Sequence, residues 1–178
     1  MKIKDGLILG MITGVIANLG KGMLMGTLKK RGYAGRSFTD TAAAFFLHGR
    51  DIKTPLGQLV GTIADYSIAL LLGISHTCFL RRTGKKNWLP KGVASGSITW
   101  VVLYGFLGTL GKSNLVYPTT ARTAFSSYLG HTLFGILNNF TAIKFGHDDL
   151  FIETQKTENR IKRTRPPRRT KISRIPTG

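Results

Sequence analysis

Residues 6–28 read GLILGMITGVIANLGKGMLMGTL, and Lys21 is the only charged residue in this stretch. At about 1.5 Å per residue, a helix over it is about 35 Å long, enough to cross the roughly 30 Å hydrocarbon layer of a membrane. Small residues recur at every fourth position and share one side of such a helix. They are Gly6, Gly10, Gly14, Asn18, Gly22 and Gly26. The stretch predicts a transmembrane helix with one narrow face for helix packing.

Three more stretches are similarly long and almost uncharged. Residues 57–80 contain only Asp65, and residues 92–111 and 125–143 contain no Asp, Glu, Lys or Arg. Pro55, Pro90 and Pro118 precede them, at positions where a helix tolerates a missing N–H. The sequence therefore predicts an all-α integral membrane protein with four transmembrane helices, at residues 6–28, 57–80, 92–111 and 125–143. A cleaved signal peptide is the alternative for the first stretch.

Charge is concentrated outside these stretches. The 178 residues include 26 Lys and Arg against 8 Asp and Glu, for a formal net charge of +18, while 42% of the chain is hydrophobic. We expect residues 1–150 to form the transmembrane domain and residues 151–178 to be a disordered basic tail, because the tail has too few large apolar side chains to fold. Its candidate lipid contacts are Arg160, Lys162, Arg163, Arg165, Arg168 and Arg169.

The distribution of basic residues predicts the orientation. The N-terminus, the loop 81–91 and the tail hold more Lys and Arg than the loops 29–56 and 112–124, which favours cytoplasmic N- and C-termini. Anionic lipid head groups are then the expected partners of the tail, together with a membrane protein or a second copy of the chain. Nucleic acid is a less favoured partner, because the basic residues mainly flank the apolar stretches.

A short helix is expected between the first two stretches. Ser37 and Asp40 have the spacing of a capping box, with Asp in place of the usual Glu, ahead of an apolar run that ends at Gly49. We expect an interfacial helix over residues 39–48, because this run is too short to cross a membrane. A shallow re-entrant segment is the alternative.

Glycine rows continue in the later stretches and favour glycine-ridge packing, in which the rows face each other. Small residues let helix backbones approach closely in lipid, where no hydrophobic force drives helices together. The helix-packing candidates beyond the first stretch are Gly57, Gly61, Gly73, Gly92, Gly96, Gly108 and Gly135.

Three ionisable side chains fall at a similar predicted depth. Lys21 and Asp65 both lie a few residues on the outer side of the middle of their stretches, and His131 lies at a comparable depth in the fourth. Asn18 and Tyr104 are candidate neighbours. Because isolated charges in hydrocarbon are costly, we expect Lys21 and Asp65 to pair inside the bundle. The pair fixes helix register in one interpretation and belongs to an ion or proton pathway in the other.

No catalytic motif is recognisable. The glycine and lysine residues do not match a P-loop, and CxxC, HExxH and GxSxG are missing from the sequence. The four histidines lack the spacing of metal ligands. We therefore expect neither an enzyme nor a bound cofactor or metal.

The order of these features resembles small bacterial inner-membrane proteins of the YqhR and YagU type. The resemblance rests on a glycine-rich first span with Asn18 and Lys21, a proline-led second span with Asp65, and a fourth span with His131. It covers roughly residues 1–150 and excludes the tail. The resemblance implies a multi-pass protein of the bacterial plasma membrane. It assigns neither an activity nor functional residues to the chain.

Two functions are compatible with the sequence. The first is a packing or accessory protein of the membrane, which engages lipid or a protein partner through its glycine faces and basic tail. The alternative is a small ion- or proton-coupled transporter that uses Lys21, Asp65 and His131.

Overall fold

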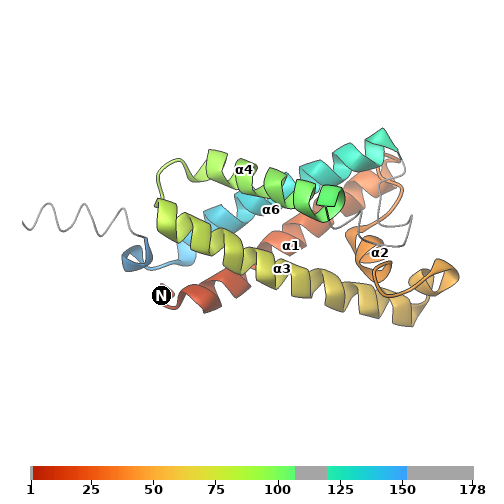
Figure 1. Cartoon of the computed structure of the whole chain (residues 1–178), viewed down its shortest axis with the longest axis horizontal. Helices are drawn as coiled ribbons and strands as arrows, with labels where there is room; N and C mark the ends of the chain where they lie inside the picture. The colour runs from red at the N-terminus through yellow and green to blue at the C-terminus, as the bar shows by residue number, and fades with distance from the viewer. Residues whose placement is uncertain (1, 107–119, 152–178) are drawn as a thin grey trace, which may run out of the picture.

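The computed structural model of the protein describes residues 2–106 and 120–151. Within these residues the regular elements are helices, apart from an isolated bridge between Ile3 and Gly146. The long helices are α1 (Gly6–Lys30), α3 (Pro55–Thr83), α4 (Trp88–Trp100), which continues into the π-helical segment η2 (Val101–Phe106), and α6 (Ala121–Phe145). The short ones are α2 (Phe38–Ala43), η1 (Gly49–Lys53) and η3 (Asp148–Leu150). The predicted all-helical class is confirmed (Figure 1).

Two of these helices, α1 and α3, are long and apolar enough to cross a membrane by length and composition. They contain the predicted spans 6–28 and 57–80. The predicted span 125–143 lies within α6, and the span 92–111 is described only as far as residue 106, so Gly108 lies outside the described residues. The described residues support two candidate spans and leave the count of four as a proposal.

The local sequence determines where the long helices begin. The carboxylate of Asp5 accepts hydrogen bonds from the backbone N–H groups of Leu7 and Ile8, at 2.7 and 3.0 Å. Thr54 caps α3 ahead of Pro55, and the Thr120 hydroxyl accepts the Thr123 N–H at the start of α6. Each cap satisfies a backbone donor that has no partner within its helix.

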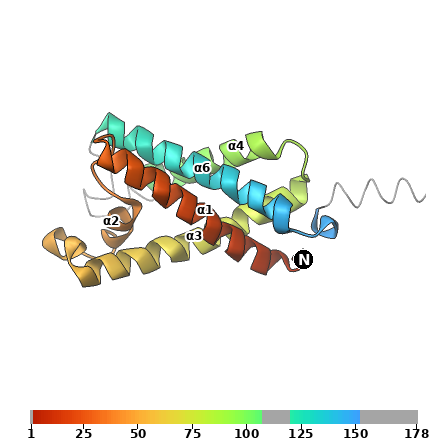
Figure 2. The same ribbon diagram turned by 180° about the vertical axis from the view of Figure 1, so that it is seen from behind.

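The helices form two glycine-packed pairs. α1 crosses α3, α4 packs on α6, and α1 lies beside α6 to join the pairs (Figures 1 and 2). A Cβ added to Gly10 would lie 2.6 Å from the Cα of Ile74, and one added to Gly96 would lie 2.8 Å from the Cα of Thr132. Glycine is required at these positions because another backbone occupies the space of a side chain.

Several glycines of the predicted rows have other neighbours. Gly14 meets Gly73 across the α1–α3 crossing, and Gly135 meets Gly92 and Gly96, as the sequence predicts. Gly57 and Gly61 instead face η1 and α2, and Gly6 faces the side chain of Arg81. Gly22 and Gly26 pack against none of the described helices, because a Cβ at either position would meet no atom within 4 Å, and their packing role stays a prediction. α1 turns this part of its glycine row away from α3.

The short helix α2 is present but is shorter and more buried than predicted. Ser37 and Asp40 form the expected capping box. α1 and α3 diverge beyond their crossing, and α2 lies in the wedge between them (Figures 1 and 2). Phe38, Ala42 and Ala43 are buried there. The apolar side of α2 therefore packs against protein, whereas a helix lying on the membrane would expose it to lipid.

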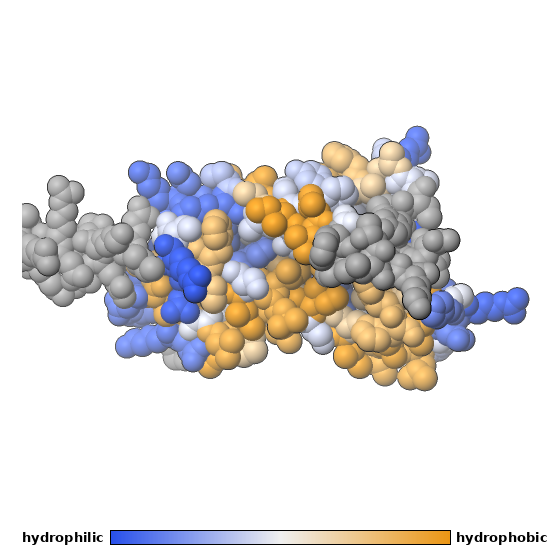
Figure 3. Space-filling view, in the orientation of Figure 1, coloured by the Kyte–Doolittle hydropathy of each residue, from blue (hydrophilic) through white to orange (hydrophobic). Residues whose placement is uncertain are grey.

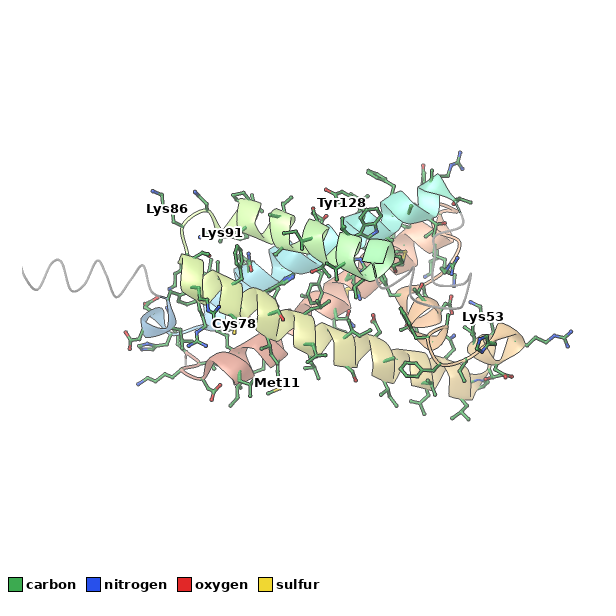
Figure 4. The ribbon with its side chains drawn as sticks, viewed as in Figure 1. Met11, Lys53, Cys78, Lys86, Lys91 and Tyr128 are labelled. Carbon is green, nitrogen blue, oxygen red and sulfur yellow. The ribbon has the colours of Figure 1, made fainter. Side chains whose placement is uncertain are left out.

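The distribution of polar and apolar side chains is the reverse of that in a water-soluble bundle. Large apolar side chains are exposed on the long helices, including Met23 at 72%, Leu71 at 66% and Ile98 at 64%. Apolar residues cover much of the middle of the visible face, and hydrophilic residues gather toward its ends (Figure 3). Lys86 and Lys91 lie at one end and Lys53 lies at the other (Figure 4).

The end that holds the N-terminus is closed by the segment after α6. Phe151 is fully buried with Leu9, Leu80 and Ala142. The ammonium group of Lys85 lies 4.6 Å from the centre of the Phe151 ring. The folded part of the chain thus includes Phe151, the first residue of the predicted tail.

Candidate functional site: a buried ion pair and chamber

The predicted ion pair between α1 and α3 is present. Lys21 Nζ lies 2.8 Å from Asp65 Oδ1, and the two side chains are only 6% and 15% exposed. The pair lies in the wedge beyond the glycine crossing, where Gly14 approaches Ala69 and Gly73. The crossing holds the helices together on one side of the pair, and their divergence leaves space on the other.

Asn18 completes the contacts of the carboxylate. Its Nδ2 group donates to Asp65 Oδ2 at 2.8 Å, while Lys21 donates to Oδ1. Asn18 and Lys21 are three residues apart and therefore lie on the same side of α1. Both carboxylate oxygens thus accept a hydrogen bond from α1.

His131 enters the same region from α6. Its Nδ1 lies 2.9 Å from the carbonyl oxygen of Ser127. Because a carbonyl can only accept, the proton of a neutral imidazole is on Nδ1, and Nε2 is left as the acceptor. His131 is 3% exposed, and the rings of Phe38 and Tyr104 pack edge-on against it at 5.0 and 5.6 Å.

Phe38 and Thr41 of α2 belong to this site, although the sequence analysis did not single them out. The Lys21 ammonium lies 4.2 Å from the centre of the Phe38 ring, within the range of a cation–π interaction. The capping box at Ser37 was visible in the sequence and places Phe38 at the first helical position. The sequence does not show that the Phe38 ring points into the bundle, because this direction depends on the divergence of α1 and α3.

Lys21, Asp65, Tyr104 and His131 line one cavity. Its volume is about 40 Å³, and Phe38, Thr41 and Leu103 complete part of its wall. A cavity needs roughly 10–15 Å³ of such volume to hold one water molecule, so this one has room for two or three. We call this cavity the chamber. Tyr104 lies in η2, and π-helical turns are frequent at functional sites.

The chamber has the chemical groups needed to take up and release a proton. It combines an ammonium group, a carboxylate, an imidazole and a phenol, and only the imidazole has an ordinary pKa near neutral pH. A proton on His131 Nε2 would place a second positive charge near Lys21, and Asp65 would offset part of that repulsion. Proton uptake at His131 would therefore depend on Asp65 as well as on the imidazole itself.

A second ion-pair cluster holds α2 in place. Asp40 is 6% exposed as a side chain and lies 2.7 Å from Lys53 Nζ and 3.4 Å from Lys29 Nζ. Gln58 of α3 donates to its other oxygen at 3.0 Å. Burial alone would raise the pKa of Asp40, but the hydrogen bonds from Lys53, the Ser37 backbone and Gln58 together hold it well below its ordinary value. In the sequence, Asp40 is recognisable only as a capping residue.

The other predicted sites lie elsewhere. The candidate lipid contacts from Arg160 to Arg169 are outside the described residues. Among residues 2–106 and 120–151, no group of three His, Cys, Asp or Glu side chains is placed to hold a metal ion. Near the N-terminal end, Asp148 pairs with Lys2 and Lys85, and these contacts, Lys85 foremost, lower its pKa.

No protein-family model, curated protein or solved structure matches this chain. The function therefore has to be inferred from the geometry of the chain itself. The resemblance to proteins of the YqhR and YagU type stays a prediction.

Proposed function

We propose that the chain is a multi-pass protein of the bacterial plasma membrane with four spans and cytoplasmic termini. The exposed apolar side chains on the long helices and the polar side chains between them support this proposal. α6 has 25 residues, which is long enough to cross, and its buried Ser, Asn and His side chains explain why it is less apolar than α1. α4 and η2 supply the start of the remaining span.

Within this frame, we propose that the protein moves protons, alone or together with a small ion, through the chamber. The observation that carries the proposal is that Lys21, Asp65 and His131, from three different helices, line one water-sized cavity. An ion pair that served only to fix helix register would gain most from tight packing on all sides, because a void forfeits contacts. Ionisable side chains inside a membrane protein typically mark ion or proton pathways.

Flux measurements on the purified full chain in liposomes test this function. A potassium diffusion potential set with valinomycin drives protons, and an enclosed pH-sensitive dye reports their entry. We expect Asp65→Asn to abolish flux in a protein that still folds. Ser67→Ala is the matched control, because Ser67 is an exposed residue of the same helix whose hydroxyl bonds only to the Ile63 carbonyl.

The simultaneous replacement Lys21→Met with Asp65→Leu separates a functional pair from a structural one. The double variant keeps similar volumes and removes both charges, so a pair that only fixes register is dispensable in it. We expect the double variant to fold and to be inactive. Wild-type flux in this variant would refute the proton pathway, as would the lack of flux in the wild-type protein itself.

A second candidate function is the accessory role expected from the sequence. It is favoured by the outer half of α1, where Gly22, Met23 and Gly26 face away from every described helix. Glycines four residues apart on an open face suit contact with a helix of another protein. The test compares copurification in mild detergent of the full chain, a chain truncated after Gln155, and Gly22→Leu. A stoichiometric partner lost in either variant would support this function, and recovery of the chain alone would argue against it.

A further inference from the structure

A second group of buried polar side chains lies on the other side of the helix crossing from the chamber. His76 of α3 is 5% exposed, and its Nε2 lies 3.0 Å from the hydroxyl of Thr99 on α4. Its Nδ1 is buried and has no hydrogen-bond partner among the described residues. The contact with Thr99 and the nearby ring of Phe134 place His76 of α3 against both α4 and α6.

Asn138 of α6 lies in the same region. It is fully buried, and its Nδ2 lies 3.5 Å from the hydroxyl of Thr77, which in turn lies 3.2 Å from the hydroxyl of Thr13. The carbonyl oxygen of the Asn138 side chain has no partner among the described residues, and the same holds for that of Asn139. We call His76, Thr99, Thr77, Thr13 and Asn138 the inner polar group.

Unpartnered buried atoms point to a small polar ligand. A buried donor or acceptor without a partner costs about 1–3 kcal/mol, so native proteins satisfy nearly all of them. Water is the usual partner where the protein supplies none, since it can both donate and accept. The unpartnered imidazole nitrogen of His76 and the amide oxygen of Asn138 are therefore candidate contacts for water.

One aromatic ring lies between the inner polar group and the chamber. Phe134 is 1% exposed and follows His131 by three residues on α6, so it lies about one turn farther along the helix. Its ring centre is 5.6 Å from the ring of His76 and 5.9 Å from the ammonium group of Lys21. Ala17 and Ala69 pack around it. Phe134 thus contacts the polar groups on both of its sides.

We propose that the inner polar group is a hydrated proton-binding site, centred on His76, that continues the pathway from the chamber, and that Phe134 is the apolar barrier between the two. The proposal rests on the proposed proton flux through the chamber. Apolar constrictions stop conduction by excluding water, and a ring that turns aside restores contact between the two hydrated regions.

The proton balance at His76 is simple. A neutral ring takes up one proton from water at its free nitrogen and becomes imidazolium. The proton on Nε2 then passes to the Thr99 hydroxyl, which releases its own proton to a second water molecule, and a neutral ring of the opposite tautomer is left. Reorientation of the neutral ring, which carries its N–H back to the Thr99 side, then resets the site, so each cycle takes up one proton on one side and releases one on the other.

The test uses the full chain in the liposome assay described above. His76→Gln keeps a group that can bond to Thr99 but cannot carry a proton, so we expect flux to fall by roughly 100-fold or more. Phe134→Ala removes the barrier and should raise flux several-fold above that of Phe134→Leu, which keeps a large apolar side chain at the same position. Thermal unfolding in detergent checks that each variant folds.

A second measurement separates this proposal from the proposed function. Water-edited solid-state NMR of the protein labelled with 15N-histidine reports whether water reaches the His76 ring, with His76→Gln as the assignment control. Hydration of His76 with reduced flux in His76→Gln supports the proposal. Flux that needs Asp65 but not His76 overturns this inference and leaves the proposed function intact. A hydrated His76 without wild-type flux overturns both the pathway and the proposed function, and a dry His76 overturns the site itself.

Discussion

The Lys21–Asp65 pair gives a first prediction about stability. Asp65→Leu leaves the Lys21 ammonium buried without its carboxylate, which costs about 3–5 kcal/mol in the free energy of unfolding. Lys21→Met together with Asp65→Leu should recover most of this loss, because two apolar side chains replace both charges. Equilibrium unfolding in mixed micelles of mild detergent and SDS measures all the variants. Equal stabilities of Asp65→Leu and the wild type would mean that the pair is not buried in solution.

Asp40 gives a prediction about pH. Its pKa is lowered in the folded protein, whereas an unfolded Asp titrates near 3.9. The unfolded state therefore binds more protons at acidic pH, so the contribution of Asp40 is complete above this value and is lost as the pH falls below it. We expect Asp40→Asn to be about 1–3 kcal/mol less stable at pH 7, because hydrogen bonds to a buried carboxylate weaken.

Unfolding measured between pH 3 and pH 7 tests this prediction. The stability difference between wild type and Asp40→Asn should shrink at the acidic end of the range. Asp51→Asn is the control, since Asp51 is exposed and its side chain makes no ion pair among the described residues. A difference that stays constant with pH would contradict a lowered pKa at Asp40.

At the scale of the helix, some glycines of the predicted rows lie in a helix crossing and others face open space. Gly73 lies in the α1–α3 crossing, where an added Cβ would be 2.5 Å from the Cα of Gly14. Gly22 has open space around it. We predict that Gly73→Ala lowers the free energy of unfolding by about 1–3 kcal/mol through overpacking. Gly22→Ala should be neutral or slightly stabilising, because Ala favours the helix and meets no neighbour.

Unfolding of the two variants side by side in the same detergent provides the measurement. Each variant adds one methyl group to a long helix. A difference between their free energies of unfolding therefore reflects the atoms that surround each glycine. A similar loss at Gly22 would show that a partner or a second copy covers this face of α1, in agreement with the accessory function. A harmless Gly73→Ala would contradict the close crossing.

At the scale of the whole molecule, the membrane orientation can be tested. We replace Cys78 and introduce single cysteines at Tyr33, which is 53% exposed, and at the exposed Lys86. The two positions lie beyond opposite ends of the long helices. We predict that a membrane-impermeant thiol reagent labels position 33 in intact cells and position 86 only after lysis.

The opposite labelling pattern would reverse the proposed orientation, and labelling of both positions in intact cells would contradict a spanning bundle. A third cysteine in the basic tail, at position 170, should behave like position 86. Lys29 and Lys30 end α1 and Arg31 follows it on the proposed outer side, an arrangement that the positive-inside rule disfavours. The labelling at position 33 is therefore the most informative.

The sequence by itself determined the helical elements of this protein and the identity of its buried charges. Long stretches with few charges predicted α1, α3 and α6, because an apolar stretch of this length satisfies its backbone hydrogen bonds as a helix. The matching depth of Lys21 and Asp65 predicted their ion pair, since a charge in an apolar interior needs a partner. The capping box at Ser37 and Asp40 was likewise local information.

Only the tertiary structure decided which faces of these helices are used. α1 and α3 cross at Gly14 and Gly73, so only the first part of the glycine row of α1 contacts α3. Gly22 and Gly26 stay open, because straight helices that cross at an angle touch over a limited length. Their divergence makes room for α2, and with it for Phe38 and the chamber. The position of His76 in the inner polar group and that of Phe134 between this group and the chamber depend on the same angle, which no single helix encodes.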